Sequence, residues 1–194
     1  LRKIPLMKKL LTAALFALAF SAQAQVELAG VKFEPTVNLG GANLQLNGAG
    51  IRYKAIFKVY AMGVYVGKKT KEPAEVSGQP GPKRITVTML REIDANELGK
   101  LFSRGIEDEI PKNQFATVIP SIVRMSQVFS DHKTLKAGDS FTFDWIPGKG
   151  GILTIKGVAV ADTFKEPEFY TAMMNIWLGK TPPDFKLKEA LLGG

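Results

Sequence analysis

Alternating apolar and polar positions predict β-strands before and after the central residues 95–129. Residues 84–90 place Ile85, Val87 and Met89 on one side and threonines between them, and a period of two is typical of a strand with one buried face. Residues 51–66, rich in β-branched and aromatic side chains, give the strongest strand signal. Shorter strands are predicted over 31–39, around Leu44 and Leu46, and over 141–145, 152–155 and 158–161.

Apolar residues spaced by three and four positions predict helices between these strands. Leu98, Leu101, Phe102 and Ile106 form a stripe that predicts a helix over about 95–109. Two more helices are predicted, over about 113–129, with Phe115, Ile119 and Ile122 in its stripe, and over about 167–178.

Cap and turn residues mark the boundaries of these elements. Asp94 has the side chain of a helix N-cap, and Pro111 ends the helix that follows. Residues 70–83 are rich in Pro and Gly and predict a loop, 147–151 predict a hairpin, and Asn47-Gly48 predicts a turn. Strands, then helices, then strands predict an α+β fold with a mainly antiparallel sheet.

The N-terminal segment has the pattern of a signal peptide. After Met7, the expected start, come Lys8 and Lys9, an apolar run of 11 residues, and the small residues of Ala22-Gln23-Ala24. The apolar run is too short to span a bilayer, which needs about 20 residues. We therefore expect residues 1–24 to be a signal peptide, with 1–6 an upstream extension, and 25–194 to be one periplasmic domain. An uncleaved anchor or a buried N-terminal helix is the alternative.

Composition removes several kinds of chemistry. The chain has no Cys and one His, which excludes disulfide scaffolds, thiol nucleophiles and multi-His or Cys metal sites. Residues 1–24 hold four of the 26 basic residues and no acid, so the remaining 22 basic and 18 acidic residues leave a net charge of +4. No dense basic tract with interleaved aromatics is present, so we expect no nucleic-acid partner. We also expect no metal and no cofactor.

Few polar residues stand out as candidates for catalysis. His132 lies at the predicted end of a helix, where a solvated cation is the simpler interpretation. Glu107, Asp108 and Glu109 are consecutive and point in different directions on a helix, so they predict a solvated face rather than a paired-carboxylate site.

Two segments resemble the chalcone isomerase-like family. The first is 48–66, with Arg52 and the run Tyr60-Ala-Met-Gly-Val-Tyr65, which is similar to the strand T-A-I-G-V-Y of the plant enzymes. The second is 175–193, beginning Asn-Ile-Trp-Leu-Gly-Lys-Thr-Pro-Pro-Asp, which resembles the C-terminal stretch of the bacterial, secreted branch. Together the resemblance covers about 26–193.

The resemblance implies an open-faced β-sandwich, in which a large antiparallel sheet is covered by a layer of helices with a ligand cleft between them. Arg52 matches the family arginine that holds an anionic oxygen, whereas Tyr60 replaces the catalytic threonine. The plant catalytic tyrosine falls near 96–98, where no Tyr stands, and a polar clamp falls near Arg104 and 176–177. An Arg and a Tyr at these positions look more like the fatty-acid-binding branch.

The implied site is a cleft for an apolar small-molecule acid. A guanidinium offers a bidentate fork to a carboxylate, and a tyrosine hydroxyl adds a donor. The residues expected to bind the ligand are Arg52, Tyr60, Leu98, Leu101, Phe102, Ile119 and Ile122. If the protein is an enzyme, Arg52 and Tyr60 are its catalytic candidates. We expect a monomer, and transient contact with a membrane stays open.

Three hypotheses follow, in this order. The first is a non-catalytic binder of a fatty acid or similar carboxylate. The second is an isomerase, an intramolecular lyase acting on an unsaturated substrate. The third is a structural envelope protein whose core is filled.

The spacing of Arg52 and Tyr60 sets a geometric condition. Eight residues on a straight strand span about 26 Å at roughly 3.3 Å per residue, too far for one carboxylate. Shared contact with a ligand therefore requires a turn or bulge near 53–55.

Overall fold

The computed structural model describes residues 25–160 and 163–194. Within them a seven-stranded sheet has the order β11-β10-β9-β6-β5-β4-β3, and every neighbouring pair is antiparallel. The predicted signal peptide lies outside the described residues. No helix of the described part combines the length and the apolar character needed to cross a membrane.

The strands of this sheet are β3 (Thr36–Leu39), β4 (Ala42–Lys54), β5 (Phe57–Val66), β6 (Lys83–Met89), β9 (Ser140–Ile146), β10 (Gly150–Ile155) and β11 (Val158–Ala159). Two small ribbons are formed by β1 (Val26–Leu28) with β2 (Val31–Phe33), and by β7 (Ile93–Asp94) with β8 (Thr134–Leu135). The helices are α2 (Pro73–Gly78), α3 (Ala95–Glu109), α4 (Phe115–Asp131), α5 (Pro167–Leu178) and α6 (Phe185–Leu191).

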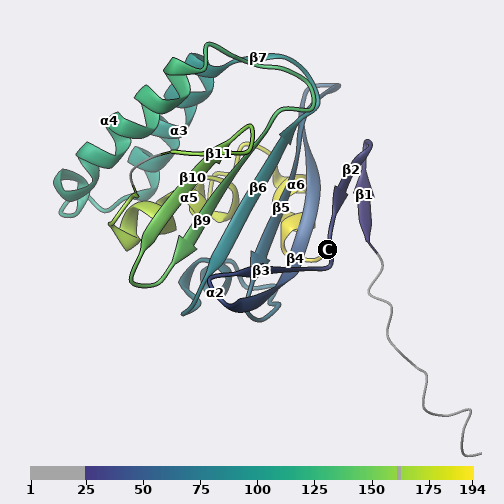
Figure 1. Ribbon diagram of the computed structural model, residues 1–194, viewed down its shortest axis with the longest axis horizontal. Coiled ribbons are helices and arrows are strands. Elements are labelled where there is room, and N and C mark those ends of the chain that lie inside the picture. The colour runs from purple at the N-terminus through teal and green to yellow at the C-terminus, as the bar shows by residue number, and fades with distance from the viewer. Residues whose placement is uncertain (1–24, 161–162) are drawn as a thin grey trace, which may run out of the picture.

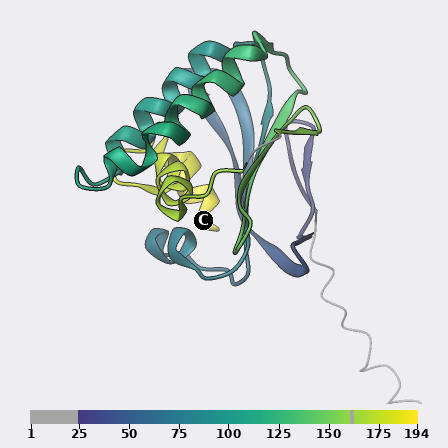
Figure 2. The ribbon, with the colours of Figure 1, turned by 60° about the vertical axis from the view of Figure 1, so that its left-hand side comes forward.

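All the helices lie on one face of the sheet, and the β1–β2 ribbon lies on the other (Figures 1 and 2). The alternation along β5 explains this division. Tyr60, Met62 and Val64 belong to the main core beneath the helices, whereas Ala61 and Tyr65 belong to a smaller cluster on the opposite face. The expected α+β architecture, a large antiparallel sheet with a helix layer, is confirmed.

The turn predicted at Asn47-Gly48 is wrong, because β4 continues through these residues with a register shift between Leu46 and Gly48. The Asn47 side chain holds this irregularity in place: its Nδ2 donates to the Leu191 carbonyl at 2.8 Å, and its Oδ1 accepts from the Thr70 backbone N–H at 2.9 Å. The extra residue reverses the alternation of the strand. As a result, Gly48 and Gly50 face the helices, whereas Ala49 and Ile51 pack on the opposite face of the sheet.

Absence of a side chain at Gly48 and Gly50 makes room for α6. A Cβ at Gly48 would overlap the carbonyl oxygens of Ala190 and Leu191, the latter at 2.6 Å, and a Cβ at Gly50 would lie 2.8 Å from the Ala190 Cβ. The C-terminal helix can therefore pack directly on β4. Arg52 follows on the same face of the strand, near the N-terminal end of α6, where the Asp184 side chain accepts from the Tyr53 backbone N–H.

The long strand predicted over 51–66 is divided by a hairpin turn at Ala55 and Ile56. Ala55 adopts a positive φ of 54°, and Arg52 and Tyr60 become directly opposed partners across β4 and β5. A second register shift follows Arg52. The turn that the spacing required is therefore present, one residue further along than expected.

The central helices agree closely with the sequence pattern. Asp94 caps α3, where its Oδ1 accepts from the backbone N–H groups of Asn96 at 2.9 Å and Glu97 at 3.1 Å. The helix predicted over 113–129 is α4, displaced by two residues and continuous through Pro120. The pattern did not predict α2, which lies within the loop predicted over 70–83, nor α6.

Candidate functional site

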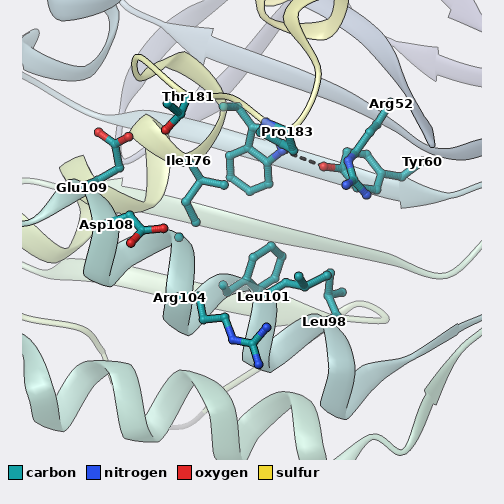
Figure 3. Close-up of a pocket in the computed structure, with 13 residues that line it drawn as sticks. Arg52, Tyr60, Leu98, Leu101, Arg104, Asp108, Glu109, Ile176, Thr181 and Pro183 are labelled. Atoms are coloured by element: carbon teal, nitrogen blue, oxygen red, sulfur yellow. Dashed lines mark hydrogen bonds between the residues drawn. The ribbon is translucent and has the colours of Figure 1, made fainter. Parts of the chain in front are cut away.

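A cavity of about 230 Å³ opens between the β4–β5 hairpin, α3 and the C-terminal end of α5 (Figure 3). Its lining combines a cationic end, an apolar middle and an acidic end. The lining residues are Arg52, Tyr60, Leu98, Leu101, Phe102, Arg104, Gly105, Asp108, Glu109, Ile176, Trp177, Thr181 and Pro183.

Arg52 lies at one end of this cavity with a donor left unsatisfied. Its guanidinium carbon is 5.6 Å from the centroid of the Tyr60 ring, a cation–π arrangement. Its Nε is buried and has no hydrogen-bond partner among the described residues. A buried charged donor without a partner costs free energy. The Arg52 side chain lines the cavity, so its guanidinium can offer donors to an acceptor that enters there.

Tyr60 stands beside Arg52 on the neighbouring strand. Its hydroxyl oxygen accepts a hydrogen bond from the Trp177 Nε1 at 2.7 Å. Burial raises the pKa of Tyr60 to about 12, with the nearby Arg52 charge and the Trp177 hydrogen bond acting in the opposite direction. The hydroxyl is therefore protonated at neutral pH, and its proton is not used in the bond with Trp177.

The middle of the cavity is apolar. Leu98, Leu101 and Phe102 come from α3, and Ile176 comes from α5. Phe102 is buried, whereas Leu101 is 52% exposed and therefore lies at the rim. A Cβ at Gly105 would lie 2.9 Å from the Ile176 side chain, so this glycine lets α3 and α5 approach each other closely.

The other end of the cavity carries Asp108, Glu109 and Thr181, which Figure 3 shows well separated from Arg52 and Tyr60. Burial raises the pKa of Glu109, and the adjacent Asp108 carboxylate adds to this shift, against the opposing effect of lysines on α6 and the preceding loop. The cavity is therefore polarised along its length.

The structure brings together five of the seven residues that the sequence predicted for ligand binding: Arg52, Tyr60, Leu98, Leu101 and Phe102. Ile119 and Ile122 do not line the cavity, because they belong to α4, and α3 lies between α4 and this space (Figure 3). Ile122 is buried in the main core and Ile119 is 42% exposed. An apolar stripe on a helix does not by itself show whether its residues line a cavity or pack elsewhere in the molecule.

Several lining residues were missed or interpreted otherwise. Glu107, Asp108 and Glu109 were expected on a solvated face, and Glu107 and Asp108 are exposed. Asp108 and Glu109 also border the cavity, because α3 ends beside α5. Thr181 and Pro183 belong to the C-terminal stretch that carried the family resemblance, which was the available signal for them. Arg104 also lines the cavity, but its guanidinium is turned away from Arg52 and Tyr60 (Figure 3).

The described residues contain no group of three or more His, Cys, Asp or Glu side chains that could hold a metal ion. The polar groups that line the cavity are the guanidiniums of Arg52 and Arg104, the hydroxyls of Tyr60 and Thr181 and the carboxylates of Asp108 and Glu109, beside apolar surface. This combination orients an amphiphile, since a polar group can pair at one end while a hydrocarbon body contacts the middle.

An antiparallel sheet under a helix layer, with this polarised cavity between them, defines an α+β protein of the chalcone isomerase-like type. The family model described as chalcone isomerase-like matches residues 24–193, and the chain belongs to this family. A search among curated proteins found no matching sequence.

A solved structure supports the fold assignment. The chain is similar to a fatty-acid binding protein of Arabidopsis thaliana, with a TM-score of 0.69 and 15% sequence identity over 87% of this chain and 96% of that chain. At 15% sequence identity, this similarity shows that the two proteins share a fold.

Proposed function

We propose that this protein is a non-catalytic binder of a fatty acid or similar apolar carboxylate, held in the cavity with its acid group at Arg52. The observation that carries the proposal is Arg52, whose guanidinium lines one end of an apolar cavity and whose buried Nε has no hydrogen-bond partner among the residues that the structure describes. A carboxylate would pair with the guanidinium and neutralise its charge.

The neighbouring groups favour the same ligand. The protonated Tyr60 hydroxyl can donate a hydrogen bond to a carboxylate oxygen, while the bond from Trp177 fixes the position of the tyrosine ring. Leu98, Leu101 and Phe102 offer an apolar wall to the hydrocarbon body. The structural neighbour from Arabidopsis thaliana is a fatty-acid binding protein, which supports the proposal further.

The size and polarity of the cavity restrict which carboxylic acids can bind. A volume of about 230 Å³ is below the roughly 300–1,000 Å³ typical of sites for drug-sized molecules. The carboxylates of Asp108 and Glu109 at the far end disfavour a second acidic group there. We therefore expect a monocarboxylic acid of short to medium chain length, or a longer chain whose tail leaves the cavity beside the exposed Leu101.

Binding is better supported than isomerase chemistry. General acid–base catalysis is most effective when the pKa of the catalytic group is near the working pH. The pKa of Tyr60 is about 12 and its oxygen already accepts a bond from Trp177, so its hydroxyl is a poor proton shuttle at neutral pH. The open space beside Arg52 also disfavours a purely structural role with a filled core.

Export to the periplasm is part of the proposal and rests on the signal-peptide pattern of residues 1–24. N-terminal sequencing of the mature protein from a periplasmic fraction tests it. We expect the sequence to begin at Gln25, and an intact N-terminus in the cytoplasmic fraction would contradict the prediction.

Titration calorimetry with saturated carboxylic acids of increasing length tests the binding function. We expect Arg52→Ala to weaken binding by about 10- to 100-fold, the loss expected for charge-assisted hydrogen bonds. Arg104→Gln is the matched control, because Arg104 lines the same cavity but is turned away from the proposed acid group. Equal affinity of wild type and Arg52→Ala, or turnover of a chalcone that depends on Arg52, would overturn the proposal.

A further inference from the structure

The turn between β4 and β5 exposes large apolar side chains. Ile56 is 83% exposed, Phe57 56% and Tyr53 41%, although buried residues begin two positions further along β5. Phe185, at the start of α6, is 64% exposed. Exposed apolar side chains gathered at one place mark an interaction surface more often than scattered ones do.

Contacts within the molecule bring these four side chains to one end of the sheet. The Oδ2 of Asp184 accepts a hydrogen bond from the Tyr53 backbone N–H at 2.9 Å, which places Phe185 next to the hairpin. The Arg91 guanidinium carbon lies 5.5 Å from the centroid of the Phe57 ring. The loop after β6 therefore borders the same surface.

The apolar side chains are surrounded by positive charge. Lys54 pairs with Phe57 and Lys58 pairs with Tyr53 across the hairpin, Lys186 follows Phe185, and all three lysines and Arg91 are exposed. We call Tyr53, Ile56, Phe57 and Phe185, together with Lys54, Lys58, Arg91 and Lys186, the hairpin patch.

Acidic residues near the hairpin patch do little to offset its positive charge. The carboxylate of Asp184 accepts from the backbone N–H groups of Tyr53, Lys186 and Leu187, so it is directed at the chain. Glu92 is exposed next to Arg91 and offsets one cation. A net positive rim around apolar tips is complementary to an anionic lipid surface, where the apolar groups enter the headgroup region and the cations pair with phosphates.

We propose that the hairpin patch is a docking surface for membranes that contain anionic lipids. The hairpin patch lies next to the cavity, so docking would bring the cavity to the membrane surface. Arg52, directly before Tyr53, and Pro183, two residues before Phe185, both line the cavity. Docking through the hairpin patch therefore brings the cationic end of the cavity close to the lipid headgroups.

Sedimentation with vesicles tests the docking of residues 25–194 in the absence of any added fatty acid. We expect binding to vesicles of phosphatidylcholine mixed with phosphatidylglycerol and little binding to phosphatidylcholine alone. Raising the ionic strength from about 0.1 to 1 M should weaken the binding, because the screening length falls from about 10 to 3 Å.

Paired variants identify the surface. Ile56→Gln with Phe57→Gln should lower the partition coefficient more than tenfold, the loss expected when apolar side chains no longer enter the interface. Lys54→Gln with Lys58→Gln should lower the partition coefficient about 25-fold, or roughly fivefold per charge. Val123→Gln is the matched apolar control, because Val123 is 63% exposed on α4, outside the hairpin patch. Lys149→Gln is the charge control, because Lys149 lies in the β9–β10 turn at the opposite end of the sheet (Figure 1).

Three results would overturn the docking proposal. They are absence of binding to anionic vesicles, binding that the two paired variants retain, and self-association that depends on the hairpin patch, which would make a second copy of the chain its partner. Circular dichroism of each variant establishes that it is folded. Because no acid is added, these outcomes are independent of whether the cavity binds a carboxylate.

Discussion

The chemistry of the site begins with Arg52 and Tyr60, two residues placed opposite each other by a short turn. The buried Nε of Arg52 has no hydrogen-bond partner in the described part of the chain, and the Tyr60 hydroxyl is both buried and protonated. The unpaired Nε has a cost in the unliganded protein, because buried polar groups stabilise a fold only when they are paired, whereas the Tyr60 hydroxyl is paired with the Trp177 Nε1. A ligand with a carboxylate would relieve the cost at Arg52.

At this scale Trp177 positions the tyrosine. Tyr60→Phe removes the acceptor for the Trp177 Nε1 and leaves a buried donor unpaired. We expect a loss of about 1–3 kcal/mol in the free energy of unfolding, measured by urea denaturation. Tyr53→Phe is the control, because Tyr53 is 41% exposed, and its effect should stay within about 0.5 kcal/mol. Equal stability of the two variants would show that the Trp177 bond contributes nothing.

Alkaline pH tests the state of the same hydroxyl. The pKa of Tyr60 rises from 10.0 to about 12 on folding, so the unfolded chain releases this proton at lower pH than the folded one. Its contribution to stability is present below pH 10 and is lost as the pH rises to about 12. Tyr60→Phe should show a shallower fall in stability over this range in urea titrations. An unchanged slope would contradict the burial of the hydroxyl in its protonated form.

At the scale of elements, β4 links the C-terminal helix to the site. The bulge at Asn47 turns Gly48, Gly50 and Arg52 toward the helices, and the two glycines make space for α6. The position of Pro183 at the cavity rim therefore depends on a strand more than 100 residues earlier.

Gly48→Ala tests this dependence. A Cβ there overlaps the α6 backbone, so we expect a loss of about 1–3 kcal/mol in the free energy of unfolding, the range measured for overpacked cores. Gly78→Ala is the control, because a Cβ at Gly78 meets nothing within 4 Å and its φ is not positive. Thermal unfolding of both variants compares them. A harmless Gly48→Ala would mean that α6 is not held against β4.

The elements differed in how far the sequence determined them. Residues 84–90, 95–109 and 167–178 have clear periodicity and clear boundaries, and their structure follows the pattern. The hairpin at Ala55 and Ile56 interrupts a run of strand-forming residues without a glycine or proline, so only the distance between Arg52 and Tyr60 indicated it. The turn signal at Asn47-Gly48 was overridden by side-chain bonds to Leu191 and Thr70, which are remote in the sequence.

The residues of the candidate site could likewise be predicted only in part from the sequence. Arg52 and Tyr60 could be singled out through the family resemblance, and the stripe of α3 supplied Leu98, Leu101 and Phe102. Ile119 and Ile122 belong to an equally apolar stripe, and only the packing order of α3 and α4 excludes them from the cavity. Tertiary arrangement determines which apolar residues form a core and which form a cavity.

At the scale of the whole molecule, the cavity connects the helix layer to one end of the sheet, where the hairpin patch lies. A ligand that bridges β4, β5 and α3 binds only the folded state, so it should stabilise the whole domain. At a ligand concentration 100 times the Kd, the gain is about 2.7 kcal/mol.

Thermal unfolding with and without a medium-chain acid measures this linkage. The midpoint should rise for wild type and for Arg104→Gln, and the rise should be much smaller for Arg52→Ala at the same ligand concentration. An equal rise in all three proteins would place the bound acid elsewhere on the molecule.

The central claim, that the cavity holds an apolar acid by its carboxylate, is tested most directly by a crystal structure of residues 25–194 grown with a medium-chain carboxylic acid. The account predicts carboxylate density with an oxygen about 2.7–2.9 Å from a nitrogen of the Arg52 guanidinium, the usual length of a charge-assisted bond, and the hydrocarbon chain along Leu98 and Phe102. Density for the acid outside this cavity, or a carboxylate at the end lined by Asp108 and Glu109, would contradict it.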